Sequence, residues 1–196
     1  MEWDIALKSE LEILKFPDAA AFEVWLRENH AKSDGFWMLF AKKGAPTTSV
    51  TYAEAVEVSL CYGWIDGQAK SVDETSYLQR YTPRRARSIW SKINRVKVER
   101  LIEEGRMQPA GLAEIERAKA DGRWEQAYDS PSTAQAPEDF LAELGKNPQA
   151  AAFFETLNAT NRYAILWRLQ TAKKPETRRN RMEKILGMLE RGEKFH

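Results

Sequence analysis

Residues 51–67 read Thr-Tyr-Ala-Glu-Ala-Val-Glu-Val-Ser-Leu-Cys-Tyr-Gly-Trp-Ile-Asp-Gly, and they contain signals for both the start and the end of a helix. Thr51 and Glu54 form a Thr-x-x-Glu pair, in which each side chain accepts from a backbone N–H at the start of a helix. Apolar residues then recur at the spacing of one helix face, and Gly63 stands where a left-handed residue would end the helix. We therefore predict a helix that delivers Trp64–Gly67 into a turn.

Short strands are predicted on both sides of this helix. The upstream run Phe36–Phe40 is apolar and bounded by turn residues, which is typical of a buried strand. Downstream, apolar residues are spaced among polar ones as in one or two strands connected by residues 73–76, at Val72, Tyr77, Leu78 and Tyr81. The pattern predicts an α+β fold, in which a small antiparallel sheet packs with helices.

Three more helices are expected in the same part of the chain. Asp18 is the natural N-cap of a helix that fades near Asn29. Asn94 is the expected N-cap of a helix that stops at Gly105. Pro109 starts a helix that ends at Asp121 and Gly122.

The C-terminal part of the chain is predicted to be all-helical. Residues 128–137 are rich in Ser, Pro, Ala and Gln without periodicity, which is typical of a linker. We place an α+β domain at 1–128, a linker at 129–137 and a helical module at 138–196. Its helices are expected at 137–144, 148–157 and 161–172, with a last one from Pro175.

Composition limits the possible functions. The chain has 196 residues with 43% hydrophobic and 30% charged residues, as in folded globular proteins. The net charge of +1 gives no reason to expect nucleic acid or an anionic membrane as the default partner. The N-terminus has acidic residues where a signal peptide is basic, and apolar windows are too short to cross a bilayer. We expect a cytoplasmic location without membrane insertion.

No cofactor or metal is expected from the motifs. Cys61 is the only cysteine, so an internal disulfide and a thiolate-rich metal site are excluded. The two histidines, His30 and His196, do not form a metal-binding spacing. The chain also lacks the glycine-rich motifs that hold nucleotides in P-loop and dinucleotide-binding proteins.

Cys61, His30 and Asp66 form a weak candidate for catalysis. A thiol nucleophile needs a base within hydrogen-bond reach and a group that orients the base. Cys61, however, lies beside the apolar stripe of its helix, where a free cysteine is usually a small buried hydrophobe. Asp66 could act as a general base or hold an arginine, but Asp followed by Gly is also a common turn, which we favour.

The stretch from Trp64 to Lys92 is the stronger functional candidate, because aromatic residues alternate there with cations. Arginine forks clamp phosphate or carboxylate, and tryptophan and tyrosine provide stacking faces. No acidic residue occurs between Glu74 and Glu99. The alternative is that the tryptophans fill the core and the arginines are solvated. The predicted ligand-binding residues are Trp64, Lys70, Arg80, Arg84, Arg85, Arg87, Trp90 and Lys92.

A second basic stretch lies in the C-terminal tail. Arg178, Arg179 and Arg181 could contact nucleic acid phosphates. The tail lacks interleaved aromatic residues, and glutamates offset its charge at helical spacings, so a solvated helix face is the favoured interpretation.

The motifs together resemble the YdeI/OmpD-associated family of bacterial proteins over nearly the whole chain. The N-terminal motifs that carry the resemblance are Lys42–Gly44, Ser49–Ala55, Gly63–Gly67, Tyr81–Arg85, Ser88–Lys92 and Arg106–Gly111. The C-terminal motifs, Ala152–Phe154 and Ala172–Arg178, look like the small bacteriocin-protection module. The resemblance implies a role in tolerance to bacteriocins or cationic antimicrobial peptides and an association with an outer-membrane porin. It implies no catalytic residues.

The sequence is compatible with three functional hypotheses. The first is a non-enzymatic binding or stress-tolerance protein, whose basic and aromatic segment binds an anionic small molecule or an acidic protein partner. The second is a small-substrate enzyme that uses Asp66 or Cys61 in a pocket walled by Trp64 and Trp90. The third is a nucleic-acid-binding module.

Overall fold

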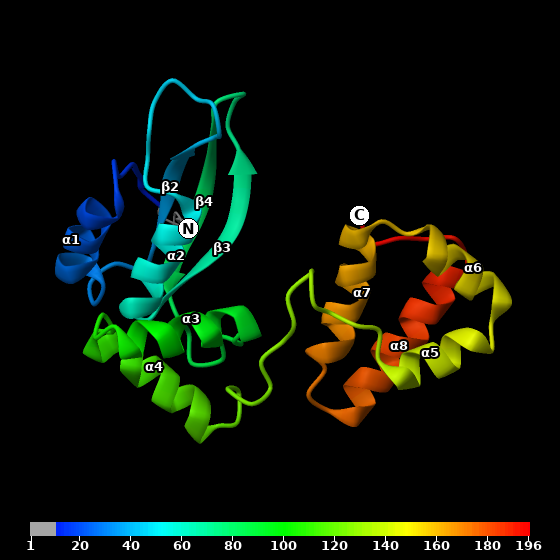
Figure 1. Ribbon diagram of the computed structural model, residues 1–196. Coiled ribbons are helices and arrows are strands. Elements are labelled where there is room, and N and C mark those ends of the chain that lie inside the picture. The colour runs from blue at the N-terminus through cyan, green and yellow to red at the C-terminus, as the bar shows by residue number, and fades with distance from the viewer. Residues whose placement is uncertain (1–10) are drawn as a thin grey trace, which may run out of the picture. The chain divides into compact units, whose positions relative to one another are not determined.

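The computed structural model describes residues 11–196, which form two compact units (Figure 1). The first unit contains the described residues up to Ser88 together with Asn94–Glu125, and the second contains Ile89–Ile93 and Gln126–His196. The first unit combines a sheet with helices and the second is built from helices, so the predicted α+β class with C-terminal helices is confirmed.

A mostly antiparallel sheet organises the first unit. Its strands follow the spatial order β1-β2-β4-β3 and are β1 (Ile13–Leu14), β2 (Phe36–Ala41), β3 (Trp64–Ser71) and β4 (Ser76–Pro83). Strand β4 pairs antiparallel with both β2 and β3, whereas the short β1 pairs parallel with β2. The predicted hairpin is therefore present as β3 and β4, and the unpredicted β1 completes the sheet.

Within the described residues, the helices of the first unit are α1 (Ala19–Asn29), α2 (Tyr52–Cys61), α3 (Lys92–Glu103), whose first two residues belong to the second unit, and α4 (Pro109–Ala120). All but α3 begin where the sequence predicts. Asp18 accepts from Ala21 N at 2.8 Å, and the capping box of Thr51 and Glu54 is complete. Gly63 follows α2 with φ 73°, the left-handed conformation that glycine adopts without strain.

Aromatic side chains join α1 to one face of the sheet. Phe22 of α1 lies edge-on to Phe36 of β2 and Tyr81 of β4, with ring centroids 5.9 and 5.8 Å apart. Trp25 contacts Phe36 and Trp64 in the same way. Full burial of a side chain such as Phe22 contributes about 1.5–3 kcal/mol, so this cluster is a principal source of stability for the unit.

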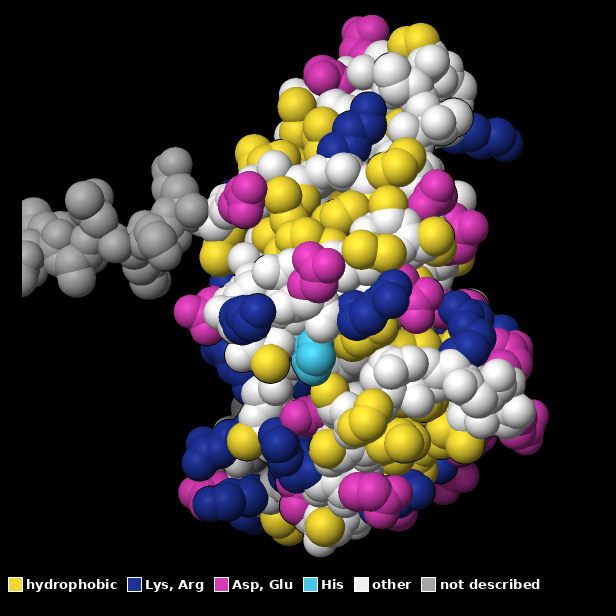
Figure 2. Space-filling view, turned by 90° about the vertical axis from the view of Figure 1, so that its left-hand side faces the viewer, with side chains coloured by type: hydrophobic (Ala, Val, Ile, Leu, Met, Phe, Trp, Pro, Cys, Tyr) yellow, Lys and Arg dark blue, Asp and Glu magenta, His cyan; other side chains and the backbone are white. Residues whose placement is uncertain are grey.

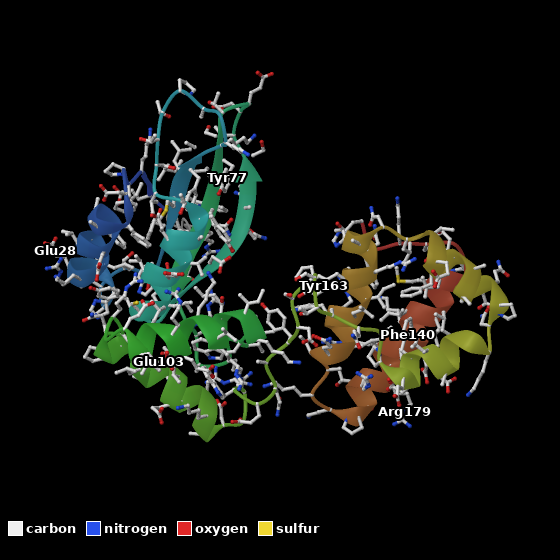
Figure 3. The ribbon with its side chains drawn as sticks, in the orientation of Figure 1. Glu28, Tyr77, Glu103, Phe140, Tyr163 and Arg179 are labelled. Carbon is white, nitrogen blue, oxygen red and sulfur yellow. The ribbon has the colours of Figure 1, made fainter. Side chains whose placement is uncertain are left out.

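Four short helices form the second unit around an apolar core. They are α5 (Glu138–Gly145), α6 (Pro148–Thr156), α7 (Ala159–Gln170) and α8 (Pro175–Glu190). Asn147 and Asn158 cap α6 and α7 through their side-chain oxygens. Phe140 points into the core, as Figure 3 shows, where it packs edge-on against Phe154. The predicted helices 137–144, 148–157 and 161–172 each agree with an observed helix to within two residues.

Two local predictions are wrong. Trp64–Gly67, predicted as a turn, begins strand β3 and pairs with β4. Asn94, predicted as an N-cap, lies inside α3, which begins two residues earlier at Lys92. The first error arises because Asp66-Gly67 has turn chemistry, while the pairing with β4 is a non-local interaction that overrides it.

The surface on the side of α1 carries charges of both signs among hydrophobic side chains (Figure 2). This mixture agrees with the nearly neutral composition. Among residues 11–196, no helix is long and apolar enough to span a bilayer.

Candidate functional site

The sheet face opposite α1 and α2 brings together an aromatic ring and two cations. We call this surface the basic sheet face and define it by Trp37, Leu39, Lys70, Leu78 and Arg80. Trp37 and Arg80 are direct cross-strand neighbours, and Lys70 is the neighbour of Leu78. Lys70 Nζ lies 4.4 Å from the centroid of the Trp37 ring, within the range of a cation–π contact.

Alternation along the strands explains why these side chains gather on one side. Successive residues of a strand point to opposite faces, so Phe36, Met38 and Phe40 enter the core while Trp37 and Leu39 remain partly exposed. Arg80 lies between the buried side chains Gln79 and Tyr81 and points to the same side as Trp37.

A bulge in β3 positions Lys70. The register of β3 against β4 shifts between Asp66 and Ala69, and Gln79 Nε2 donates to the carbonyl oxygen of Gly67 at 2.6 Å. The side-chain amide thus satisfies a backbone acceptor that the irregular ladder leaves open. Beyond the bulge, regular pairing resumes and places Lys70 opposite Leu78.

The electrostatics of this face are uniformly positive. Strands β2, β3 and β4 contain one acidic residue, Asp66, and it belongs to the helix-covered side, where it accepts from Tyr52 Oη at 2.7 Å. Within residues 11–196, no carboxylate forms an ion pair with Lys70 or Arg80, and Arg80 Nε is buried without a hydrogen-bond partner. An anionic group on this face would meet two cations without competition from a neighbouring carboxylate.

The arginines that follow β4 differ from one another in exposure. Arg84 is buried, and its backbone N–H donates to the carbonyl of Gly63 at 2.9 Å. Arg85 and Arg87 are exposed in a tight loop, where the Arg85 N–H donates to Ser88 Oγ. Of these three predicted residues, Arg85 and Arg87 are therefore the accessible ones.

Two predicted tryptophans, Trp64 and Trp90, are buried. Trp64 is 1% exposed, packs on Trp25 and Phe36, and donates from Nε1 to the carbonyl of His30. Trp90 is also 1% exposed and belongs to the second unit, as does Lys92, which forms an ion pair with Asp129 at 2.7 Å. Burial of both rings favours the packing interpretation for them.

The weak catalytic candidates occupy different environments. Cys61 is buried, and burial raises the pKa of its thiol to about 11. His30 Nδ1 lies 2.9 Å from the carbonyl oxygen of Leu26, and Asp66 is bonded to Tyr52. In the part of the chain that the structure describes, no hydrogen bond joins Cys61, His30 and Asp66 to one another. A protonated, buried thiol favours packing over nucleophilic chemistry.

A hollow of about 360 Å³ lies beneath the loop between β2 and α2. Its lining combines lysines, hydroxyl groups and two tyrosines, and includes Lys42, Lys43, Thr47, Thr48, Tyr52 and Tyr77. Tyr77, which Figure 3 labels on β4, stacks on Phe40 with centroids 5.1 Å apart. Lys42 is already engaged with Ser71 Oγ and the carbonyl of Asp73, so the loop is tied to the β3–β4 hairpin.

Metal-binding side chains do not gather within the described residues. Among residues 11–196, no group of three or more His, Cys, Asp or Glu side chains is placed to hold an ion.

Sequence reasoning missed Trp37 as a surface residue. Its run, Phe36–Phe40, is apolar throughout, so the alternation between buried and exposed positions is hidden. The exposed position of Trp37 follows from its antiparallel pairing with Arg80. Sequence spacing alone does not reveal this pairing, so the sequence held no signal for it.

Two family models match the chain, and the interval between their matches includes the boundary between the two structural units. Residues 14–114, which are 101 of the 196 residues, match the model of a domain of unknown function, DUF8412. Residues 133–192 match the family described as "Bacteriocin-protection, YdeI or OmpD-Associated". No curated protein and no solved structure matches the chain. The predicted YdeI/OmpD-associated relationship is confirmed for residues 133–192, in the helical unit. The N-terminal motifs that were expected to carry it lie in the region that matches DUF8412 instead. The chain therefore belongs to the DUF8412 family and carries, in its second unit, a domain of the bacteriocin-protection, YdeI or OmpD-associated family.

Proposed function

We propose that this protein is a non-enzymatic binding protein of bacteriocin or antimicrobial-peptide tolerance, and that it binds an acidic protein partner through the basic sheet face. The description of the family matched at residues 133–192 supports the tolerance role. The sheet face of the first unit supplies the binding chemistry.

The observation that carries the proposal is the position of Lys70 and Arg80 around Trp37. Two cations lie on a half-exposed apolar surface from which the only carboxylate of the three strands, Asp66, is turned away. An acidic segment placed there would gain charge-assisted contacts with both cations. It would also cover the partly exposed side chains of Leu39 and Leu78.

An acidic protein segment fits this surface better than nucleic acid does. Proteins that bind duplex DNA typically neutralise about 6–10 phosphates. The basic sheet face offers two cations, and exposed Arg85 and Arg87 beyond the end of β4 bring the number to four. Apolar side chains between the cations suit a peptide strand in which acidic and apolar residues take turns at every second position, since every second residue of a strand points to the same surface.

Survival of bacteria tests the proposal. A strain without the gene would receive the wild-type protein, the double variant Lys70→Gln plus Arg80→Gln, or the control Lys32→Gln plus Arg117→Gln. The control changes the net charge equally at exposed positions on and beside helices of the same unit. After challenge with a bacteriocin or a cationic peptide, we expect protection by the wild type and the control but not by the double variant. Equal protection by all three proteins at matched expression would refute the role of this face.

A further inference from the structure

A hollow of about 290 Å³ lies along α7 and α8 of the second unit. It is lined by two aromatic rings, three cations and one aliphatic side chain, which are Trp167, Arg168, Arg181, Lys184, Ile185 and Phe195. Helices α7 and α8 contact each other directly within this unit, so the lining comes from elements that share one core. The volume is just below the range of about 300–1,000 Å³ that is typical of small-molecule sites.

Helical spacing and the C-terminal segment assemble this lining. Arg181 and Lys184 are three residues apart on α8 and therefore share a face. Trp167 and Arg168 lie in the last turn of α7. Phe195 follows α8 and is held in place because His196 N donates to Asn161 Oδ1 at 3.0 Å. Five of the six lining residues are thus fixed by two helices.

Among residues 11–196, the arginines that line the hollow retain N–H donors that form no hydrogen bond with the protein. Arg168 donates from Nη1 to Ala164 O and stacks on Phe195, with Cζ 3.8 Å from the ring centroid. Arg181 donates from Nη1 to Arg168 O at 2.7 Å and to Thr171 Oγ1 at 3.2 Å. Within the described residues, neither guanidinium uses Nε or Nη2, and no carboxylate pairs with Arg168, Arg181 or Lys184.

A purely structural role explains part of this arrangement. Arg181 satisfies a carbonyl near the C-terminal end of α7, where a positive charge is favourable. That role uses one nitrogen of one arginine, and it gives no reason for Lys184 to line the same hollow or for acidic residues to be missing from the lining. Surface cations of this protein are often paired, as Arg178 is with Asp139 on the same helix bundle.

We infer that this hollow binds a small molecule that carries a phosphate group on a flat ring. Three cations suit a doubly charged phosphate better than a singly charged carboxylate, because each can contribute a charge-assisted hydrogen bond. The exposed part of Trp167 provides a stacking face for the ring. The site lies in the second unit and is independent of the basic sheet face, so it goes beyond the proposed function.

Calorimetric titration of the full chain with phenyl phosphate tests this inference. We expect saturable binding that weakens with salt. Inorganic phosphate, which lacks the ring, and phenol, which lacks the phosphate group, should each bind at least roughly tenfold more weakly. Lys184→Gln should weaken phenyl phosphate binding by roughly tenfold, because it removes one charged contact without touching a hydrogen bond of the fold.

The controls separate this site from general electrostatics. Arg179→Gln removes an exposed charge from the same helix (Figure 3) and should leave the affinity unchanged. Lys70→Gln plus Arg80→Gln should also leave the affinity unchanged. The proposal for this hollow and the proposal for the basic sheet face can therefore be refuted separately. Absence of saturable binding to the wild type, or equal weakening by Lys184→Gln and Arg179→Gln, would overturn the inference.

Discussion

Gly111 of α4 packs directly on the end of α2 at Cys61. A β-carbon at Gly111 would lie 2.3 Å from the carbonyl oxygen of Cys61 and 2.7 Å from that of Leu60. The backbone N–H of Gln108 donates to the same Cys61 carbonyl at 3.1 Å, so the start of α4 is also bonded to α2. This close contact holds α4 against the helix whose exit leads into β3, and it encloses Cys61 within the unit.

Gly111→Ala should therefore destabilise the first unit. The added methyl group meets backbone atoms rather than a flexible side chain, so the helices must separate, at a cost of about 1–3 kcal/mol. Urea unfolding followed by tryptophan fluorescence measures the change. Gly67→Ala is the matched control, because the nearest atom to its β-carbon would be Arg80 Cβ at 3.7 Å. Identical unfolding midpoints for the two variants would contradict the tight contact.

Cys61 should resist alkylation in the folded protein. Burial raises the pKa of the thiol to about 11, so at pH 8 only a trace is thiolate, and the side chain is shielded from reagents. We expect iodoacetamide to modify the folded chain at least about tenfold more slowly than the same chain in urea. Equally fast modification in both states would show an accessible, reactive thiol and would revive the enzyme hypothesis.

Asp139 should make the second unit sensitive to acid. Arg178 donates to both carboxylate oxygens of Asp139, at 2.7 and 2.9 Å, and thereby lowers the pKa of Asp139 below its ordinary value of 3.8. Because the pKa of Asp139 is lower in the folded than in the unfolded chain, the ion pair contributes its full stability at pH values above the ordinary pKa of 3.8. This contribution is lost as the pH falls through the lower pKa of the folded chain.

Hydrogen exchange of the α5 amides at decreasing pH tests this dependence within the second unit. Protection should fall less steeply in Asp139→Asn than in the wild type, because the variant has no carboxyl group to titrate. Glu138→Gln, at the neighbouring exposed position, is the control and should follow the wild type. Superimposable profiles for the wild type and Asp139→Asn would exclude the ion pair as a source of acid sensitivity.

Local signals in the sequence predicted where α1 and α2 begin. The non-local pairing of strands could not be predicted from such signals. The caps at Asp18 and Thr51 are hydrogen bonds between residues three apart, so the sequence contains both partners at fixed spacing. The turn predicted at Trp64–Gly67 is instead a strand, because β4 supplies hydrogen-bond partners that a local pattern cannot contain. Tertiary pairing therefore decides the conformation of this segment.

The candidate sites were predictable only in part. Lys70 and Arg80 were among the predicted binding residues, and the structure places them on one face with Trp37. Their role in binding stays a prediction. The hollow of the second unit was not predicted, because the aromatic residues Trp167 and Phe195 are distant in sequence from Arg181. Packing of α7 and the C-terminal segment supplies the aromatic rings that the basic tail itself lacks.

Binding of an acidic peptide is the most direct test of the basic sheet face. A short fluorescent peptide in which glutamate and leucine take turns at every second position, with serine between them, would be titrated with the wild type and with Lys70→Gln plus Arg80→Gln, at low and high salt. We predict salt-sensitive binding that weakens at least roughly tenfold in the double variant and is retained in Lys32→Gln plus Arg117→Gln. The same affinity in all three proteins would contradict the account, as would a preference for a single-stranded oligonucleotide over the peptide.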